Sequence, residues 1–337
     1  MVLAVLVGSG LIAACGGQDD TASGEVVLYT SVPESIIERL SGVVEQRFPD
    51  LEGEYWVPPH GGITLRVERG RTADIQQRIA EDIETTGSIQ ADVIWLAEPS
   101  PYETYKDMGL LAPYQPTPDA PIPVGYLDPD GYYVAGRVIS MVIAWNTSLR
   151  PEGLSDWSDL AAVHANAFPA PESGAARATI KAITESQGLD YFSRLKHVGG
   201  VSVPSNGAAR DGLVEGEFEA VAVLDYMARQ AKEDGSAIDF AYPNSGTVLI
   251  PSPIAITADA LNPGAAEVFV DFILSQAGQK IVVEIGSFYP ARTDVAAPPG
   301  APPLDEITSL AVDWKALAGE ESAISEFWEE VYGPQGP

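Results

Sequence analysis

Apolar residues along this chain follow two different spacings, which alternate from one segment to the next. Segment 25–31 is a nearly continuous apolar run, and such a run predicts a buried strand. In segment 33–48 the apolar residues recur every three or four positions, which predicts an amphipathic helix. Another helix is predicted at 73–83 and another short apolar strand at 91–96. Strand, helix and strand in this order favour a parallel sheet covered by helices.

The same two patterns continue through the rest of the chain. Further strands are predicted at 138–145, 220–224, 237–241 and 254–257, and further helices at 174–184, 189–196, 265–274 and 324–331. Proline and glycine cluster instead at 114–125 and 297–303, which favours linkers or crossovers there. The predicted fold class is therefore α/β.

The start of the chain has a different character. An apolar run too short to cross a bilayer, which takes about 20 residues, leads into small residues and Cys15, the only cysteine. This pattern resembles a bacterial lipoprotein signal, with 1–14 as signal peptide, 15–24 as flexible tether and Cys15 as the lipidated residue. The alternative is a cysteine that follows a buried apolar segment by chance. No basic residue precedes Arg39, which departs from the usual signal and favours a true start upstream of Met1.

Charge and motifs narrow the function. The chain has 48 acidic and 19 basic residues and a formal net charge of -29, which disfavours nucleic acid as a partner. It lacks a phosphate-binding loop ending in lysine and a His-Glu-x-x-His motif, and its histidines, His60, His164 and His197, are dispersed. We therefore expect no enzymatic activity and no cofactor. A cell-envelope hydrolase stays the rival class, although no residue motif in the chain indicates a catalytic base and nucleophile.

Several short motifs carry a resemblance to a known family through their order along the chain. They are 29–31, 61–62, 91–95, 109–114, 128–133, 145–147, 156–160, 171–174, 265–272, 274–279 and 289–292. In this order they resemble the extracellular solute-binding proteins of ABC importers. More specifically, the chain is similar to the branch of the family that includes ferric-ion, phosphonate and sugar-phosphate binders. The similarity covers the chain from Glu25 to Arg292.

The resemblance implies a two-lobed periplasmic-binding-protein-like fold with a ligand cleft between the lobes. Lobe 1 would comprise 25–116, completed by about 252–300, lobe 2 would comprise 117–251, and 301–337 would form a C-terminal helical segment. The implied partners are a small anionic solute and the ABC permease subunits in the membrane. A monomer, lipid-anchored on the extracytoplasmic face of the cell membrane, is expected.

Ligands of open α/β sheets bind beyond the carboxyl ends of the strands, where loops lead into helix N-termini. Small and hydroxyl residues gather at four such places in the predicted fold. The candidate ligand-binding residues there are Thr30, Ser31, Gly61, Gly62, Thr64, Ser173, Gly174, Ser205 and Asn206. Each segment also has an ordinary alternative, because these residue types are preferred helix caps.

Basic residues are scarce in this chain, and the positions of a few arginines indicate the charge of the ligand. Arg66, Arg137 and Arg177 lie close to the candidate loops or to the predicted crossing strand. A guanidinium group binds carboxylate or phosphate through two parallel hydrogen bonds, so an anionic ligand follows from them. The alternative for each arginine is a solvated surface charge paired with one of the many acids.

Ferric ion is the alternative ligand, and it needs hard oxygen donors such as tyrosinate. Ferric binders of this family carry two adjacent tyrosines after a strand of the second lobe, and the matching place here holds Tyr226 followed by methionine. Asp225, Tyr226, Tyr132 and Glu98 would be the donors of an iron site. For an organic anion, such as a phosphonate or sugar phosphate, Tyr226 would instead hydrogen-bond the ligand, and Asp225 would pair with an amino group on it.

Overall fold

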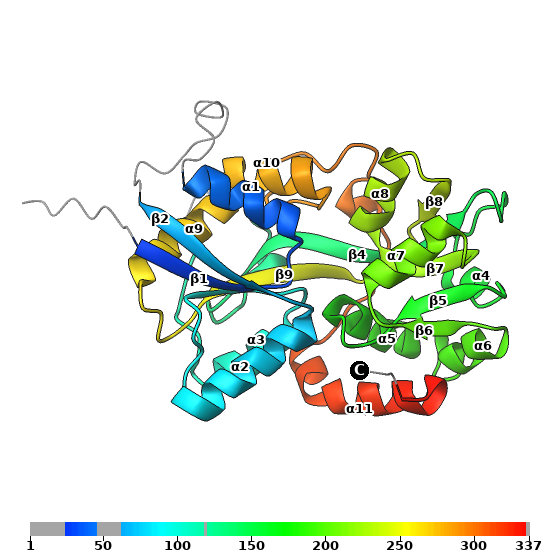
Figure 1. Cartoon of the computed structure of the whole chain (residues 1–337), viewed down its shortest axis with the longest axis horizontal. Helices are drawn as coiled ribbons and strands as arrows, with labels where there is room; N and C mark the ends of the chain where they lie inside the picture. Colours follow the sequence, from blue (N-terminus) through cyan, green and yellow to red (C-terminus); the bar gives the residue numbers. More distant parts are fainter. Residues whose placement is uncertain (1–23, 46–61, 118–119, 335–337) are drawn as a thin grey trace, which may run out of the picture.

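The computed structural model describes residues 24–45, 62–117 and 120–334, and it shows the α/β architecture expected from the sequence (Figure 1). Cys15, Gly61, the predicted signal peptide and most of the predicted tether lie outside the described residues. The strands are β1 (Gly24–Thr30), β2 (Ile63–Arg69), β3 (Val93–Trp95), β4 (Val134–Asn146), β5 (Asn166–Pro169), β6 (Val201–Val203), β7 (Ala220–Leu224), β8 (Ile238–Ala241) and β9 (Leu249–Ile256).

The strands are hydrogen-bonded in the order β2-β1-β3-β9-β4-β7-β5-β6, with β8 also paired to β4. Strand β4 joins the two parts of this sheet. Its first half, Val134–Ser140, pairs with β9, and its second half, Met141–Asn146, pairs with β7 and β8. We call the part around β1, β2, β3 and β9 lobe 1, and the part around β5, β6, β7 and β8 lobe 2.

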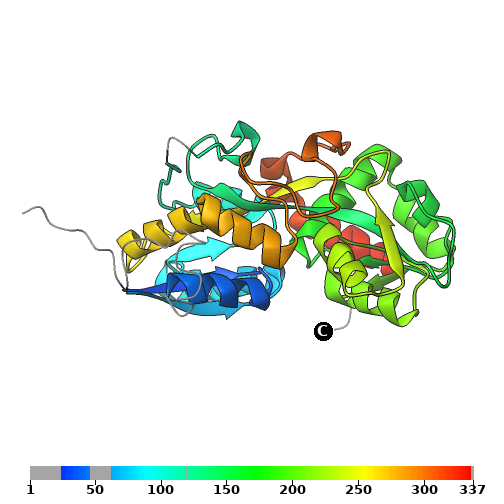
Figure 2. The same cartoon turned by 90° about the horizontal axis from the view of Figure 1, so that it is seen from above.

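Helices cover both faces of the sheet in each lobe (Figures 1 and 2). They are α1 (Glu34–Val44), α2 (Thr72–Thr86), α3 (Ser100–Asp107), α4 (Trp157–Leu160), α5 (Gly174–Gln187), α6 (Tyr191–His197), α7 (Asn206–Glu215), α8 (Asp225–Glu233), α9 (Pro263–Leu274), α10 (Gln276–Gly286) and α11 (Trp314–Tyr332). In lobe 1, α1, α9 and α10 lie on one face of the sheet and α2 and α3 on the other.

The continuous apolar run of β1 follows from this two-sided cover. Val26 and Leu28 pack with α1 on one face, whereas Val27 and Tyr29 pack with α2 and α3 on the other. Side chains of successive strand residues point to opposite faces, so a strand that is covered on both sides needs apolar residues at every position. The predicted strand 25–31 therefore has the pattern of a central strand.

The second strand differs from the expectation. Segment 61–64 was expected to be a loop beyond the end of a strand, but Ile63 and Thr64 belong to β2, which runs from Ile63 to Arg69; residues 46–61 lie outside the described part of the chain. Its residues alternate in burial, since β2 lies at the edge of the sheet and one face is open to solvent. The carboxyl end of this strand is consequently at Arg69, eight residues beyond Gly61 in sequence number.

Helix α11 is longer than the predicted 324–331 and lies against both lobes. It packs on α3 in lobe 1 and on α5 and α6 in lobe 2 (Figure 1). Trp328 of α11 is buried against Phe168 and Phe192 of lobe 2, with ring centroids 5.8 Å and 5.1 Å away. No helix in the described part of the chain is long and apolar enough to cross a membrane.

Candidate functional site

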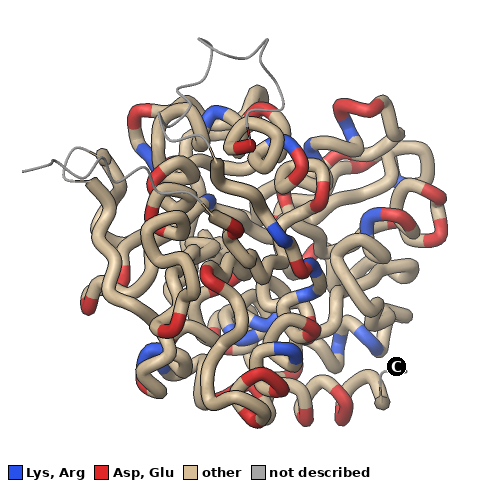
Figure 3. Tube along the Cα trace, turned by 60° about the vertical axis from the view of Figure 1, so that its left-hand side comes forward, with Lys and Arg blue, Asp and Glu red and all other residues tan. Residues whose placement is uncertain are grey.

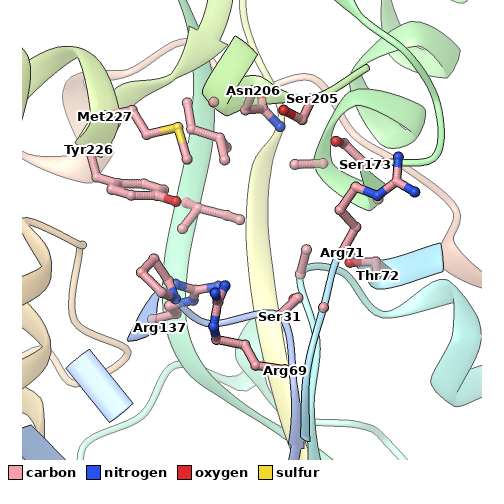
Figure 4. Close-up of a pocket in the computed structure, with 18 of the residues that line it drawn as sticks. Ser31, Arg69, Arg71, Thr72, Arg137, Ser173, Ser205, Asn206, Tyr226 and Met227 are labelled. Carbon is pink, nitrogen blue, oxygen red and sulfur yellow. The ribbon is translucent and has the colours of Figure 1, made fainter. Parts of the chain in front are cut away.

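A pocket of about 380 Å³ lies between the lobes, where several helices begin. The starts of α1 and α2 line it from lobe 1, and the starts of α5, α7 and α8 line it from lobe 2 (Figure 4). The first N–H groups of a helix have no partner within the helix, and the helix dipole makes this end positive. The pocket is therefore suited to a negatively charged group.

Arg137 reaches this pocket because strand β4 is irregular beside it. The register between β4 and β9 shifts between Ala135 and Arg137. The residue between them is Gly136, where a Cβ atom would lie only 2.8 Å from the Trp95 ring, so a larger residue does not fit. A bulge of this kind redirects the following side chain, and the Arg137 side chain points into the pocket in Figure 4.

The Arg137 guanidinium group is buried, with 2 % of the residue exposed, and it has no ion-pair partner in the described residues. Its Nε donates to the Ser252 hydroxyl at 3.1 Å, and the group lies 4.2 Å from the Phe288 ring centroid. Its Nη1 has no hydrogen-bond partner. Burial lowers the pKa of Arg137 to about 10, against the opposing attraction of Tyr226 and Asp225. The group is still charged at neutral pH.

Two further buried polar atoms of the pocket also lack partners. The Ser31 hydroxyl, after β1, and the Asn206 side-chain oxygen, at the start of α7, make no hydrogen bond with the described residues. A buried polar group without a partner costs roughly 1–3 kcal/mol. Unpaired polar atoms from β1, β4 and α7 therefore converge on one cavity, and a polar ligand would satisfy them together.

Tyr226 lines the pocket from α8 and is 5 % exposed. Its ring packs against Phe288 with centroids 4.4 Å apart. Burial raises the pKa of Tyr226 to about 12, although the nearby Arg137 lowers it. At neutral pH the hydroxyl is therefore a neutral donor. Met227 follows it in the lining and presents a thioether instead of a second phenol.

The two candidate serines at helix starts have different roles. Ser205 caps α7, since its hydroxyl accepts a hydrogen bond from the Ala208 N–H at 3.1 Å. Ser173 precedes α5 but makes no such cap. Both residues line the pocket together with Gly174. The alternative of ordinary helix capping thus holds for Ser205, while the Ser173 hydroxyl stays free of the cap.

Arg69 and Arg71 line the pocket, although the sequence reasoning did not select them. They follow from the position of β2, whose carboxyl end lies at Arg69. Arg69 is 3.7 Å from Glu34, the acidic residue of the lining, and Arg71 makes two hydrogen bonds to Asp74. The lining thus has an excess of positive charge, in a chain whose acidic residues are spread over both lobes (Figure 3).

Several sequence candidates in lobe 1 lie outside the pocket. Thr64 and Arg66 are within β2, and Arg66 is a surface residue whose charge pairs with Glu25 at 3.3 Å and Glu68 at 3.6 Å. Gly62 precedes the same strand, at the end opposite Arg69. Thr30 is buried, and its hydroxyl is used within the fold: it donates to the Trp95 carbonyl at 2.8 Å and accepts from the Val32 N–H.

Arg177 and Asp225 lie next to the pocket but take part in buried ion pairs. Arg177 contacts Glu98 at 2.8 Å and Glu321 at 3.0 Å. The Asp225 carboxylate pairs with Arg229 at 3.1 Å and accepts the Ser140 N–H at 3.2 Å. A buried charge requires such partners, because its desolvation is costly. These charges are compensated within the protein, and neither residue lines the pocket.

The alternative metal donors are not gathered in one place. Of Glu98, Asp225, Tyr132 and Tyr226, only Tyr226 lines the pocket. Glu98 is paired with Arg177, and Asp225 with Arg229. Across 24–45, 62–117 and 120–334, no group of three or more histidine, cysteine, aspartate or glutamate side chains is placed to hold a metal ion.

The fold and this interlobe pocket define a two-lobed binding protein, and comparison with known proteins gives its family. Residues 59–306 match the family model of the bacterial extracellular solute-binding proteins, and the chain belongs to this family. Members of the family bind solutes for ABC importers and are not enzymes, as the sequence predicted. The family is extracytoplasmic, and its members deliver their solutes to membrane permeases.

Solved structures share the fold. The periplasmic binding protein AfuA from Actinobacillus pleuropneumoniae, with fructose 6-phosphate bound, superposes with a TM-score of 0.79 at 21% identity over 93% of this chain and 99% of that one. Iron-bound HitA from Pseudomonas aeruginosa has a TM-score of 0.74 at 21% identity over 91% and 99%. The periplasmic binding protein P5PA has a TM-score of 0.76 at 18% identity over 92% and 100%. At identities this low the comparison establishes the fold alone. The ligand has to be inferred from the residues that line the pocket.

Proposed function

We propose that this chain captures a small organic anion, a phosphonate or a sugar phosphate, in the interlobe pocket and delivers it to an ABC permease. The observation that carries the proposal is the Arg137 guanidinium, a buried cation that lines the pocket with an unpaired Nη1 and no carboxylate partner in the described residues. Burying a charge without compensation is costly. An anionic ligand would supply the missing partner.

The remaining groups support a ligand with both an anionic head and hydroxyl groups. Arg69, Arg71 and the N-terminal end of α5 add positive potential around Arg137. Ser31, Asn206 and the neutral phenol of Tyr226 offer hydrogen bonds of the kind that orient hydroxyls. The volume of about 380 Å³ lies at the small end of the usual range for ligand sites, about 300–1,000 Å³.

Ferric ion is the second candidate, favoured by the likeness to iron-bound HitA and by Tyr226. The local charge opposes it, because the lining arginines repel a trivalent cation. Met227 also occupies the place of a second tyrosine, and a thioether is a poor ligand for a hard metal. The organic anion is therefore our first choice.

Capture would proceed by closure of the two lobes around the ligand. The proposed lobes are 25–116 with about 252–300, and 117–251, and the protein would act as a monomer. The ligand contacts helix starts from both lobes in the closed form, so it binds this form better and shifts the population toward it. Residues 1–14 would be removed as a signal peptide, and lipid on Cys15 would hold the protein at the outer face of the cell membrane.

Two experiments test the ligand. Native mass spectrometry of the protein purified from its own host would identify a bound molecule by its mass. Calorimetry against fructose 6-phosphate, methylphosphonate, 2-aminoethylphosphonate and ferric citrate would then rank the classes. We expect binding of an organic phosphate or phosphonate without iron. Tight ferric binding with a coloured complex, and no heat with the phosphorus compounds, would establish the iron alternative instead.

A further inference from the structure

The lobes meet at one edge of the ligand pocket in a buried cluster of charged side chains. Arg177, in the first turn of α5 in lobe 2, contacts Glu98 of lobe 1, and the Nη2 to Oε1 distance is 2.8 Å. Both side chains are nearly inaccessible to solvent. The Glu98 carboxylate also accepts hydrogen bonds from the N–H and hydroxyl of Ser100, at 2.6 Å and 2.8 Å. It is held rigidly at the start of α3.

Two further residues complete the cluster. Gln76 of α2 accepts a hydrogen bond from Arg177 Nη2 at 3.3 Å, and its own amide donates to Glu321 at 3.2 Å. Glu321 belongs to α11 and contacts Arg177 Nη1 at 3.0 Å. Side chains from lobe 1, lobe 2 and the C-terminal helix are therefore connected through one guanidinium group.

The backbones of the two lobes also approach closely here. The Ala73 N–H, at the start of α2, donates to the Glu172 carbonyl before α5 at 3.4 Å. A Cβ atom at Gly174 would lie 2.8 Å from Glu98 Cγ, so this position accepts only glycine without a shift of its neighbours. Gly174 and Thr72 both line the ligand pocket. The contact between Glu98 and Arg177 is thus at the place where opening of the lobes would separate them.

We propose that Glu98 and Arg177 form an interlobe latch, which keeps the starts of α2 and α5 together at the edge of the pocket and thereby sets the free energy of lobe closure. Neither residue lines the pocket, so both act as positioning residues. When the lobes separate, both charges become hydrated. When the lobes close, both charges are buried, and Arg177 is the cation that compensates Glu98 among the described residues.

Removal of one partner therefore disfavours closure, because the other charge is buried without compensation. In Arg177→Met, the Glu98 carboxylate would be the charge that is buried without a cationic partner. Removal of both charges, in Arg177→Met/Glu98→Gln, leaves a neutral side chain that Ser100 can still hydrogen-bond, and closure should return. This reversal distinguishes a latch from a residue that merely supports folding.

The single variant should also respond to pH. Burial raises the pKa of Glu98, while Arg177 and the Ser100 N–H lower it. Without Arg177 the lowering by its charge is lost, so the pKa of Glu98 rises further and closure recovers as the pH is lowered and Glu98 gains a proton. The other ionisable groups that face Glu98 are Glu321, which favours the protonated form by repulsion, and three tyrosines that stay neutral as the pH is lowered: Tyr102, Tyr105 and Tyr133.

The test measures lobe closure by pulsed electron paramagnetic resonance on the full chain, with no ligand added. Spin labels at Glu84→Cys on α2 and Glu215→Cys on α7, both exposed, report the interlobe distance in a Cys15→Ser background. Lys181→Met is the matched control. Lys181 lies one turn further along α5 and pairs with Glu185 and with Glu320 of α11, without a contact to lobe 1 in the described residues.

Wild type and Lys181→Met should show a population at the short distance. Arg177→Met at pH 8 should lower the ratio of short to long distances about tenfold or more. Lowering its pH to 5, or adding Glu98→Gln, should restore the ratio. Should Arg177→Met not fold, the double variant carries the test and should resemble wild type. Unchanged distances in Arg177→Met, a lack of the short population in wild type, or a double variant as open as the single one would overturn the latch. None of these results depends on the identity of the ligand.

Discussion

Replacing Arg137 by methionine should weaken ligand binding and at the same time leave the free protein as stable as before or more stable. Methionine has a similar length and no charge, so it fills much of the same space between Trp95 and Phe288. The substitution removes the buried cation and its hydrogen bond to Ser252. The Ser252 hydroxyl stays satisfied, because it donates to the Leu96 carbonyl.

The effect on stability follows from the pKa of Arg137. Its fall to about 10 in the folded protein corresponds to roughly 3 kcal/mol of cost for the charged form. Methionine removes this cost, but it also loses a cation–π contact worth about 0.5–2 kcal/mol and the hydrogen bond to Ser252, worth about 0.5–1.5 kcal/mol. The free energy of unfolding should therefore rise by about 0–2 kcal/mol. Because the folded-state pKa is the lower one, the cost is complete below about pH 10 and diminishes as the pH rises above that value.

The effect on binding has the opposite sign. Loss of one partner from a desolvated charged pair typically costs about 2–5 kcal/mol, which is a factor of about 30 to several thousand in Kd. Calorimetry of wild type and Arg137→Met against the best ligand of the panel measures this factor, and urea unfolding of the ligand-free proteins measures stability. A variant that is clearly less stable yet binds the ligand with wild-type affinity would show that Arg137 supports the fold and refute its role in binding.

Three other expectations concern neighbouring and remote residues. Tyr226→Phe should weaken binding of an organic anion by roughly 0.5–1.5 kcal/mol, the contribution of one neutral hydrogen bond, and calorimetry would detect it; a ferric complex bleached by this change would instead show an iron site. Arg66→Ala should leave the affinity unchanged, since Arg66 is exposed and paired with Glu25 and Glu68, and a loss of affinity would contradict this placement. Cys15→Ser should move the protein from the membrane to the soluble fraction, and intact-mass analysis of membrane-extracted wild type should find lipid on Cys15; protein that stays membrane-bound after the change would exclude this anchor.

The sequence located the central elements well because their signals are local. The apolar run at 25–31 and the apolar segment at 91–96 correspond to β1 and β3, which are covered by helices on both faces. The amphipathic patterns at 73–83 and 265–274 correspond to α2 and α9. Helix α8 (Asp225–Glu233) was missed although its apolar and polar residues lie on opposite faces, because it is short and most of its residues are polar.

Several of the candidate site residues line the pocket in the structure. Ser31, Ser173 and Asn206 lie directly after β1 or at the starts of α5 and α7. Arg66 was misplaced because segment 61–64 was expected to be a loop beyond a strand end, whereas residues Ile63–Arg69 form the edge strand β2. The alternation of apolar and polar residues at 63–68 was the signal that would have moved this strand and brought Arg69 and Arg71 into the candidate set.

The sequence by itself determined the α/β class, the order of the main elements and the family resemblance, because residue spacing records which faces of each element are covered. Only the tertiary structure decided which arginines are compensated. Arg137 and Arg177 look alike in sequence, each near a predicted strand or helix start. In the fold, Arg177 is paired with Glu98 and Glu321, while Arg137 Nη1 stays unpaired at the pocket. A charge's role depends on partners that are distant in sequence, and local patterns carry no information about them.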